Sequence, residues 1–237
     1  FLRGLQEQFD ARFYPSGWQQ PDYAAAGWQH AMEYSVPHTR PLICGDFNRY
    51  RIPAAWPHTG EAPETDWCIE KRDIPLLREE RIAASKAVKA GFVTCSVAFE
   101  EYFETADHET LRETVSAQAM ESADGTELFP LTLYPAPKAA TVVTFEFPEE
   151  IVGYPYIRIE AGEGTVVELL FKEAVEPEWL LLRSDPVLGQ WVRCVCKEGL
   201  TEFVAADYES LRFLQLSMRN ATGPVRVLEA GIIRRLY

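Results

Sequence analysis

The sequence predicts an all-β protein made of β-sandwich or jelly-roll domains. Several stretches alternate apolar and polar residues, as in residues 92–99, where Val93 and Cys95 share one face and Thr94 and Ser96 share the other. Turn signals separate these stretches at Asp124-Gly125, Gly162-Glu163-Gly164, Leu188-Gly189, Glu198-Gly199 and Gly223-Pro224. Many short strands joined by regular turns are typical of sandwiches and jelly rolls.

We expect strands over residues 92–99, 190–196 and 211–218, and a β-hairpin over residues 157–173 that turns at residues 161–164. In the strand at 211–218, every second residue from Leu214 to Met218 is apolar and faces one side. Residues 77–88 and 107–113 are the best helix candidates, although the first lacks a strong apolar stripe.

Prolines interrupt any regular element between residues 37 and 75, which predicts a loop-rich connector. We place a domain boundary near residues 71–77, which divides the chain into domains at 1–75 and 76–237. The first residue is Phe1 and not Met, so we expect a piece of a longer protein.

The composition excludes several classes of protein. The chain has 237 residues, of which 47% are hydrophobic and 25% charged, as expected of a folded domain with a real core. Its formal net charge of -13 repels phosphate backbones and anionic lipids, so we expect neither nucleic acid nor a membrane as a partner. No apolar run approaches the roughly 20 residues of a membrane span.

The cysteines and histidines give no metal, redox or cofactor motif. The five cysteines lack the close paired spacing of a zinc site, and the four histidines have no ligand spacing. Cys194 and Cys196 point to the same face of a strand, and we expect them to be buried free thiols. Free thiols and the lack of a visible signal segment favour a soluble, cytoplasmic protein without metal or cofactor.

The N-terminal third carries an ordered set of motifs: Asp10-Ala11-Arg12, Gly17-Trp18, Trp28 before Ala31, and Arg72-Asp73-Ile74-Pro75. This set resembles the end of the galactose-binding-like sandwich of bacterial α-L-rhamnosidases and the segment that leads to the next sandwich. The resemblance implies that residues 1–75 are a partial galactose-binding-like domain and a connector. It also implies that Trp18 and Trp28 are core residues.

Further motifs resemble the second, larger sandwich of that family. They are Thr144 to Phe147, Gly153-Tyr154, the hairpin from Gly162 to Glu173, Phe203, and Leu211-Arg212-Phe213-Leu214. One departure is Glu146-Phe147-Pro148, where the family usually has Asp-Phe-Gly, so a flexible glycine and a backbone donor are lost.

The resemblance implies a non-catalytic role for this chain. Rhamnosidases of this type resemble inverting glycosidases, whose two carboxylates lie on an α/α barrel that follows the sandwiches. This chain ends at Tyr237, where that barrel begins, so we expect no catalytic residue in it. The implied partners are the C-terminal catalytic domain and, through the parent enzyme, a rhamnose-containing glycan.

Two other functions stay open at this point. An autonomous carbohydrate-binding module would need an exposed aromatic platform. Trp56, Trp67 and Trp179 lie in Pro-rich or acidic contexts and are the candidates for stacking on a sugar. The other possibility is an unrelated β-sandwich interaction domain. Glu173, which resembles a recurring family Glu at the end of the hairpin, is a candidate for contact with a neighbouring domain.

Overall fold

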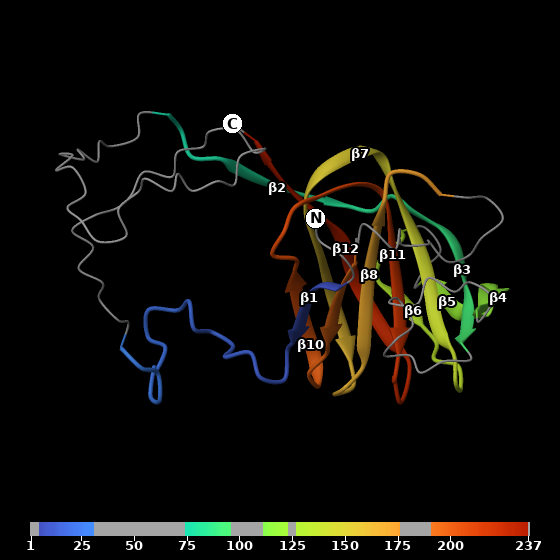
Figure 1. Ribbon diagram of the computed structural model, residues 1–237, viewed down its shortest axis with the longest axis horizontal. Coiled ribbons are helices and arrows are strands. Elements are labelled where there is room, and N and C mark those ends of the chain that lie inside the picture. The colour runs from blue at the N-terminus through green and yellow to red at the C-terminus, as the bar shows by residue number, and fades with distance from the viewer. Residues whose placement is uncertain (1–4, 31–73, 96–110, 123–126, 176–190, 237) are drawn as a thin grey trace, which may run out of the picture. The chain divides into compact units, whose positions relative to one another are not determined.

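The computed structural model describes residues 5–30, 74–95, 111–122, 127–175 and 191–236 (Figure 1). The chain divides into two compact units, residues 1–15 together with 76–237, and residues 16–75. The expected division at residue 75 differs from this one in its treatment of residues 1–15, and the domain organisation of the natural protein stays a prediction.

The predicted all-β class is confirmed. The strands in chain order are β1 (Leu5–Asp10), β2 (Arg78–Ala83), β3 (Lys86–Cys95), β4 (Leu111–Val115), β5 (Met120–Ser122), β6 (Leu131–Leu133), β7 (Ala140–Ala161), β8 (Val166–Lys172), β9 (Trp191–Val195), β10 (Gly199–Val204), β11 (Glu209–Arg219) and β12 (Val225–Leu236). A single 3-10 turn, η3 (Ala117–Ala119), is the only helical element in the described ranges.

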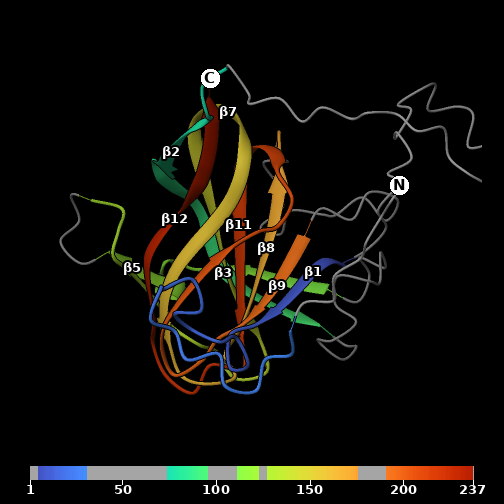
Figure 2. The ribbon, with the colours of Figure 1, turned by 90° about the vertical axis from the view of Figure 1, so that its left-hand side faces the viewer.

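The strands form two facing sheets that share β7. The first sheet has the order β1, β9, β8, β11, β7, β3 and β4, and the second has β10, β7, β12 and β2, with β6 and β5 beside the start of β12. The pairs are antiparallel except for β1, which runs parallel to β9. Figures 1 and 2 show β7 passing from one sheet to the other.

The crossing of β7 explains how the chain accommodates Pro148. The first part of β7 pairs with β11 up to Glu146, and pairing resumes at Ile151 with a shift in register opposite Arg212. Pro148 lies in the interrupted stretch, so its missing N–H removes no ladder hydrogen bond. After Gly153 the strand pairs with β12 in the second sheet.

The predicted hairpin at 157–173 is wrong, because β7 and β8 lie in different sheets. β7 ends at Ala161 in the second sheet, whereas β8 pairs with β9 and β11 in the first. The connection is tied to the chain after β9, since Gly164 N donates to Cys196 O (2.9 Å) and Cys196 N donates to Thr165 O (2.8 Å). Gly164 has a φ of +82°, which favours glycine. The apolar faces of the two strands therefore meet across the core.

The helix considered for residues 77–88 is also wrong. These residues form β2 in the second sheet and the start of β3 in the first. The chain changes sheet at Ala84 and Ser85, whose N–H groups donate to Ala230 O (3.0 Å) and Glu146 O (2.9 Å). Long-range strand pairing overrides a weak local helical signal here.

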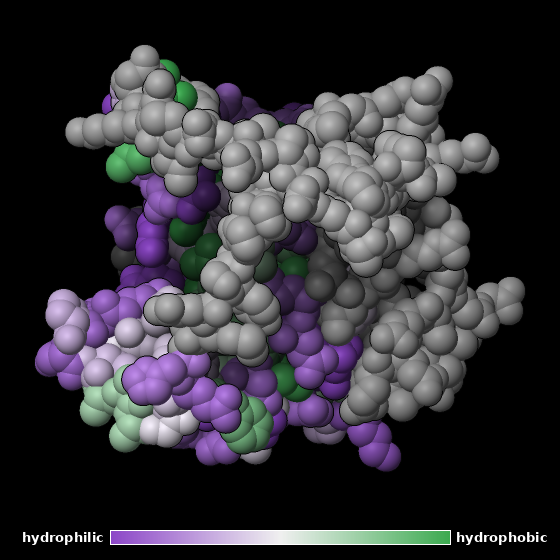
Figure 3. All heavy atoms as spheres, turned by 60° about the vertical axis from the view of Figure 1, so that its left-hand side comes forward, coloured by the Kyte–Doolittle hydropathy of each residue, from purple (hydrophilic) through white to green (hydrophobic). Residues whose placement is uncertain are grey.

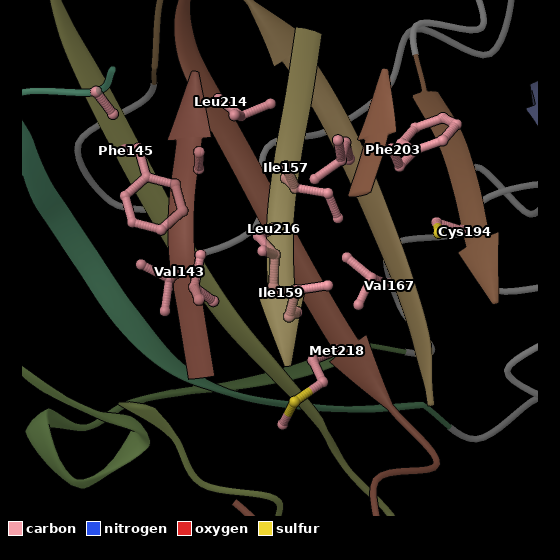
Figure 4. Close-up of a cluster of buried hydrophobic side chains, with 14 of the residues drawn as sticks. Val143, Phe145, Ile157, Ile159, Val167, Cys194, Phe203, Leu214, Leu216 and Met218 are labelled. Carbon is pink, nitrogen blue, oxygen red and sulfur yellow. The ribbon is translucent and has the colours of Figure 1, made fainter. Parts of the chain in front are cut away.

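The core lies between the two sheets and is apolar. Figure 4 shows Ile157 and Ile159 of the second sheet and Leu214 and Leu216 of the first lining the same space. The predicted inward face of residues 214–218 is confirmed, since these side chains and Met218 are buried. The predicted burial of Cys194 and Cys196 as free thiols is confirmed as well.

On the face shown in Figure 3, the described residues are mostly hydrophilic, with smaller apolar areas between them. In the part of the chain that the structure describes, no helix is long and apolar enough to cross a membrane.

Candidate functional site

The residues predicted to bind sugar cannot be placed. Trp56, Trp67 and Trp179 lie outside the described residues. Glu173 follows the last residue of β8 and is exposed. It stays a candidate for contact with a neighbouring domain.

The prediction that Trp18 and Trp28 are core residues is wrong for this chain. Their side chains are 42% and 54% exposed. They contact each other, with ring centroids 6.3 Å apart, and Tyr23 meets Trp28 edge-on at 5.8 Å. These three residues are called the aromatic cluster below.

The charged residues of the first motif pair with each other. Arg12 donates from Nε to Asp10 Oδ1 (2.9 Å) and from Nη2 to Oδ2 (2.6 Å), while its backbone N donates to Oδ1 (3.1 Å). The hydrogen bond from the Arg12 side chain holds the pKa of Asp10 below its usual value. Ala11 between them is buried, and its N–H donates to Val195 O (2.9 Å). The motif thus closes the end of β1 against β9.

A second ion pair joins two motif segments that are distant in sequence. Arg212 Nη2 lies 2.9 Å from Glu146 Oε1, and Lys86 Nζ lies 2.9 Å from Glu146 Oε2. The hydrogen bonds from Lys86 and Arg212 lower the pKa of the Glu146 carboxyl. The ion pair spans the point where the register of β7 and β11 shifts.

The outer face of the first sheet carries a buried charge cluster, formed by Glu168, Arg193, Ser217 and Arg219. Strand register places Glu168 directly between Arg193 of β9 and Ser217 of β11. Arg193 Nε donates to Glu168 Oε1 (2.7 Å), and Arg219 Nη2 donates to the same oxygen (3.0 Å). The Glu168 side chain is 1% exposed and that of Arg219 4%. One carboxylate therefore lies between two guanidinium groups in a buried place.

Two polar atoms of this cluster are not satisfied. Within the described part of the chain, neither Arg193 Nη2 nor Ser217 Oγ has a hydrogen-bond partner, although both atoms are buried. Arg193 also packs over the ring of Trp191, 5.0 Å from its centroid. In the neighbouring row Gln215 Nε2 donates to Thr144 Oγ1 (2.8 Å). This sheet face is thus buried yet polar.

The outer face of the second sheet carries exposed ion pairs. Arg158 Nε lies 2.8 Å from Glu202 on β10, and its Nη1 lies 3.8 Å from Glu229 on β12. Glu229 also accepts a hydrogen bond from the hydroxyl of Tyr156. Burial, and then this hydrogen bond, raise the pKa of Tyr156. The ring of Tyr156 lies against Gly231.

The described carboxylates are arranged to hold the fold. An inverting glycosidase needs one carboxyl with a raised pKa opposite a second one, roughly 6.5–9.5 Å away. The two carboxyl pKa shifts resolved in this chain, at Asp10 and Glu146, are both downward. The Glu168 carboxylate is buried under two arginines. Among the described residues, no group of three or more His, Cys, Asp or Glu side chains could hold a metal ion.

Sequence reasoning missed the buried charge cluster. The signal was a single charged residue within each of two apolar strands, Glu168 in VVELLFK and Arg193 in WVRCV. A charge in such a strand is either solvent-facing or paired. Only strand order tells which, because Glu168 and Arg193 meet through the pairing of β8 with β9.

Comparisons with known proteins give distant structural similarity. No protein-family model matches the sequence, and no curated protein matches it. The chain is similar to a GH78-family rhamnosidase of Bacillus sp. GL1, with a TM-score of 0.45 and 19% identity over 54% of this chain and 13% of that one. It is also similar to a rhamnosidase from Klebsiella oxytoca, with a TM-score of 0.36 and 12% identity over 67% of this chain and 30% of that one.

A third solved structure is the enzymatically active domain of tailspike protein 4 of bacteriophage CBA120, with a TM-score of 0.30 and 9% identity over 68% of this chain and 19% of that one. The chain thus spans less than a third of each of these solved structures. All three TM-scores are below 0.5.

Proposed function

We propose that this chain is a non-catalytic β-sandwich portion of an α-L-rhamnosidase-like glycoside hydrolase, which supports a catalytic barrel that lies outside it. The observation that carries the proposal is the pairing of motif residues with each other. Glu146 and Arg212 belong to separate motif segments, 66 positions apart, and form an ion pair of 2.9 Å. The resemblance to the family therefore rests partly on residues that meet in space.

The remaining motif segments of the larger sandwich also fold together. They lie on β7, β8, β10 and β11, and β11 pairs with both β7 and β8 while β10 pairs with β7. Side chains in these segments, such as Phe145, Phe203 and Leu214, belong to one core cluster. A motif set that builds a core and its ion pairs supports a scaffold role.

The ionic state of the motif carboxylates supports the non-catalytic part of the proposal. Asp10 and Glu146 both accept charge-assisted hydrogen bonds from basic side chains. A general acid must hold its proton near neutral pH, which a lowered pKa prevents. Glu173, exposed at the end of β8, is left as the carboxylate suited to contact a neighbouring domain.

Two measurements test the proposal. The purified chain is expected not to hydrolyse 4-nitrophenyl α-L-rhamnopyranoside, and turnover abolished by Glu146→Gln or Glu173→Gln would overturn the non-catalytic role. The reading frame downstream of the Tyr237 codon is expected to encode a series of amphipathic helices that can form an α/α barrel. A stop codon directly after Tyr237 would instead favour an independent interaction domain.

A further inference from the structure

The aromatic cluster is an unusual surface for a soluble protein. Trp18 and Trp28 leave about half of each side chain in solvent. Large aromatic groups normally bury most of their area, and clustered exposed aromatic rings mark binding sites. By contrast, Trp191 in the sandwich unit is fully buried. The exposed pair therefore calls for a ligand.

The backbone of residues 16–30 holds the aromatic cluster through successive turns. Gln20 N donates to Gly17 O (2.9 Å), and Trp28 N donates to Ala25 O (3.0 Å). Gly17 and Gly27, each next to one of the tryptophans, have φ values of +82° and +94°. Such turns favour glycine and set the direction of the following residue. The rings are thus presented by a defined local structure and by contact with each other.

The side chains around the cluster are neutral amides and one carboxylate. Gln19, Gln20, Asp22 and Gln29 are exposed in the same segment as the rings. Amide and carboxylate groups donate to or accept from hydroxyl groups, and an aromatic ring packs against the apolar C–H face of a pyranose. The chain's net charge of -13 and the nearby Asp22 disfavour anionic ligands such as nucleotides.

We propose that Trp18 and Trp28 form a carbohydrate-binding platform that takes a neutral pyranose. One sugar ring stacks on the exposed tryptophan faces, and the amide side chains contact its hydroxyl groups. This site differs from the predicted Trp56, Trp67 and Trp179. It goes beyond the supporting role proposed above and does not depend on it, since a chain without any link to a hydrolase could carry the same platform.

The test is a titration of the whole chain with methyl α-L-rhamnopyranoside and methyl β-D-galactopyranoside, followed by the indole N–H signals in NMR spectra. Saturable shifts of the Trp18 and Trp28 signals are expected at sugar concentrations up to about 50 mM, a range suited to millimolar binding. Trp18→Ala and Trp28→Ala assign these signals and should each weaken binding by about tenfold or more.

Tyr208→Ala is the matched control, because Tyr208 is 66% exposed but belongs to the sandwich unit. It should leave sugar binding unchanged. The absence of saturable shifts with both sugars would overturn the proposal. So would equal weakening by Tyr208→Ala, or self-association of the wild-type chain that Trp18→Ala and Trp28→Ala abolish, because the aromatic cluster would then be a protein contact. Activity on the aryl rhamnoside does not bear on any of these outcomes.

Discussion

The two sheets of the sandwich carry their charges in opposite environments. On the first sheet, Glu168 and its two arginines are buried, and on the second sheet Arg158 and Glu202 are 37% and 60% exposed at their side chains. Both sets are cross-strand ion pairs with similar distances between charged atoms, 2.7 Å and 2.8 Å. The pairs therefore differ in solvent access far more than in geometry.

Solvent access decides what each pair contributes to stability. An exposed ion pair is screened by water and typically contributes less than about 1 kcal/mol. A buried pair gives no large net gain, but removal of one member leaves a charge without compensation and costs about 3–5 kcal/mol. The first sheet thus depends on its charges being complete, and the second does not.

The largest expected effect tests this difference directly. Glu168→Gln keeps the side-chain shape and leaves Arg193 and Arg219 buried without a counter-charge, so we expect a loss of about 3–5 kcal/mol in the free energy of unfolding. The matched change on the second sheet, Glu202→Gln, should cost less than about 1 kcal/mol. Denaturant unfolding of both variants measures the two losses, and equal losses would show that burial does not separate the sheets.

A steric contact on the second sheet gives the next largest effect. A Cβ on Gly231 would lie 2.5 Å from Ile82 O and 2.7 Å from the ring of Tyr156. Gly231→Ala should therefore lower the free energy of unfolding by about 1–3 kcal/mol, since overpacking forces side chains or backbone to move. A thermal melt compares it with Gly223→Ala, where nothing lies within 4 Å of the added Cβ. If both alanines are tolerated alike, packing does not hold this face together.

A pH series distinguishes the half-exposed pairs from the buried ones. Because the pKa of Glu146 is lowered from its usual 4.5, its ion pairs stabilise the fold above about pH 4.5, and that stability is lost as the pH falls through the lowered pKa. The difference in unfolding free energy between the wild type and Glu146→Gln should be constant at neutral pH and shrink below about pH 4.5. Arg212→Gln should shift the loss to higher pH, and a difference that persists unchanged to pH 3 would contradict this assignment.

The sequence predicted the parts of the fold that depend on local alternation. The inward faces of residues 214–218 and of Cys194 and Cys196 follow from period two alone. The hairpin at 157–173 failed because a four-residue turn can join two strands of one sheet or two strands of facing sheets. Its apolar residues suit both arrangements, and only the pairing of β8 with β9 and β11 decides between them.

The candidate sites were harder to predict for a related reason. Glu168, Arg193 and Arg219 come from three strands, and no local pattern states which strands become neighbours. Trp18 and Trp28 were expected in a core because aromatic residues are usually buried. Their exposure depends on what packs against residues 16–30, which the composition of that segment does not reveal.

The smallest expected effect concerns the unsatisfied hydroxyl of the buried charge cluster. Ser217 Oγ is buried, and in the described structure it has no hydrogen-bond partner, so Ser217→Ala removes a polar atom that gains nothing in the fold. We expect the free energy of unfolding to stay within about 1 kcal/mol of the wild type or to rise slightly. Thr144→Val, two rows away in register terms, removes the acceptor of Gln215 Nε2 and should cost about 1–3 kcal/mol. A loss from Ser217→Ala as large as that from Thr144→Val, measured in the same denaturant series, would mean that a water molecule or another group satisfies the hydroxyl, and that the buried face of the first sheet is as completely hydrogen-bonded as its ion cluster requires.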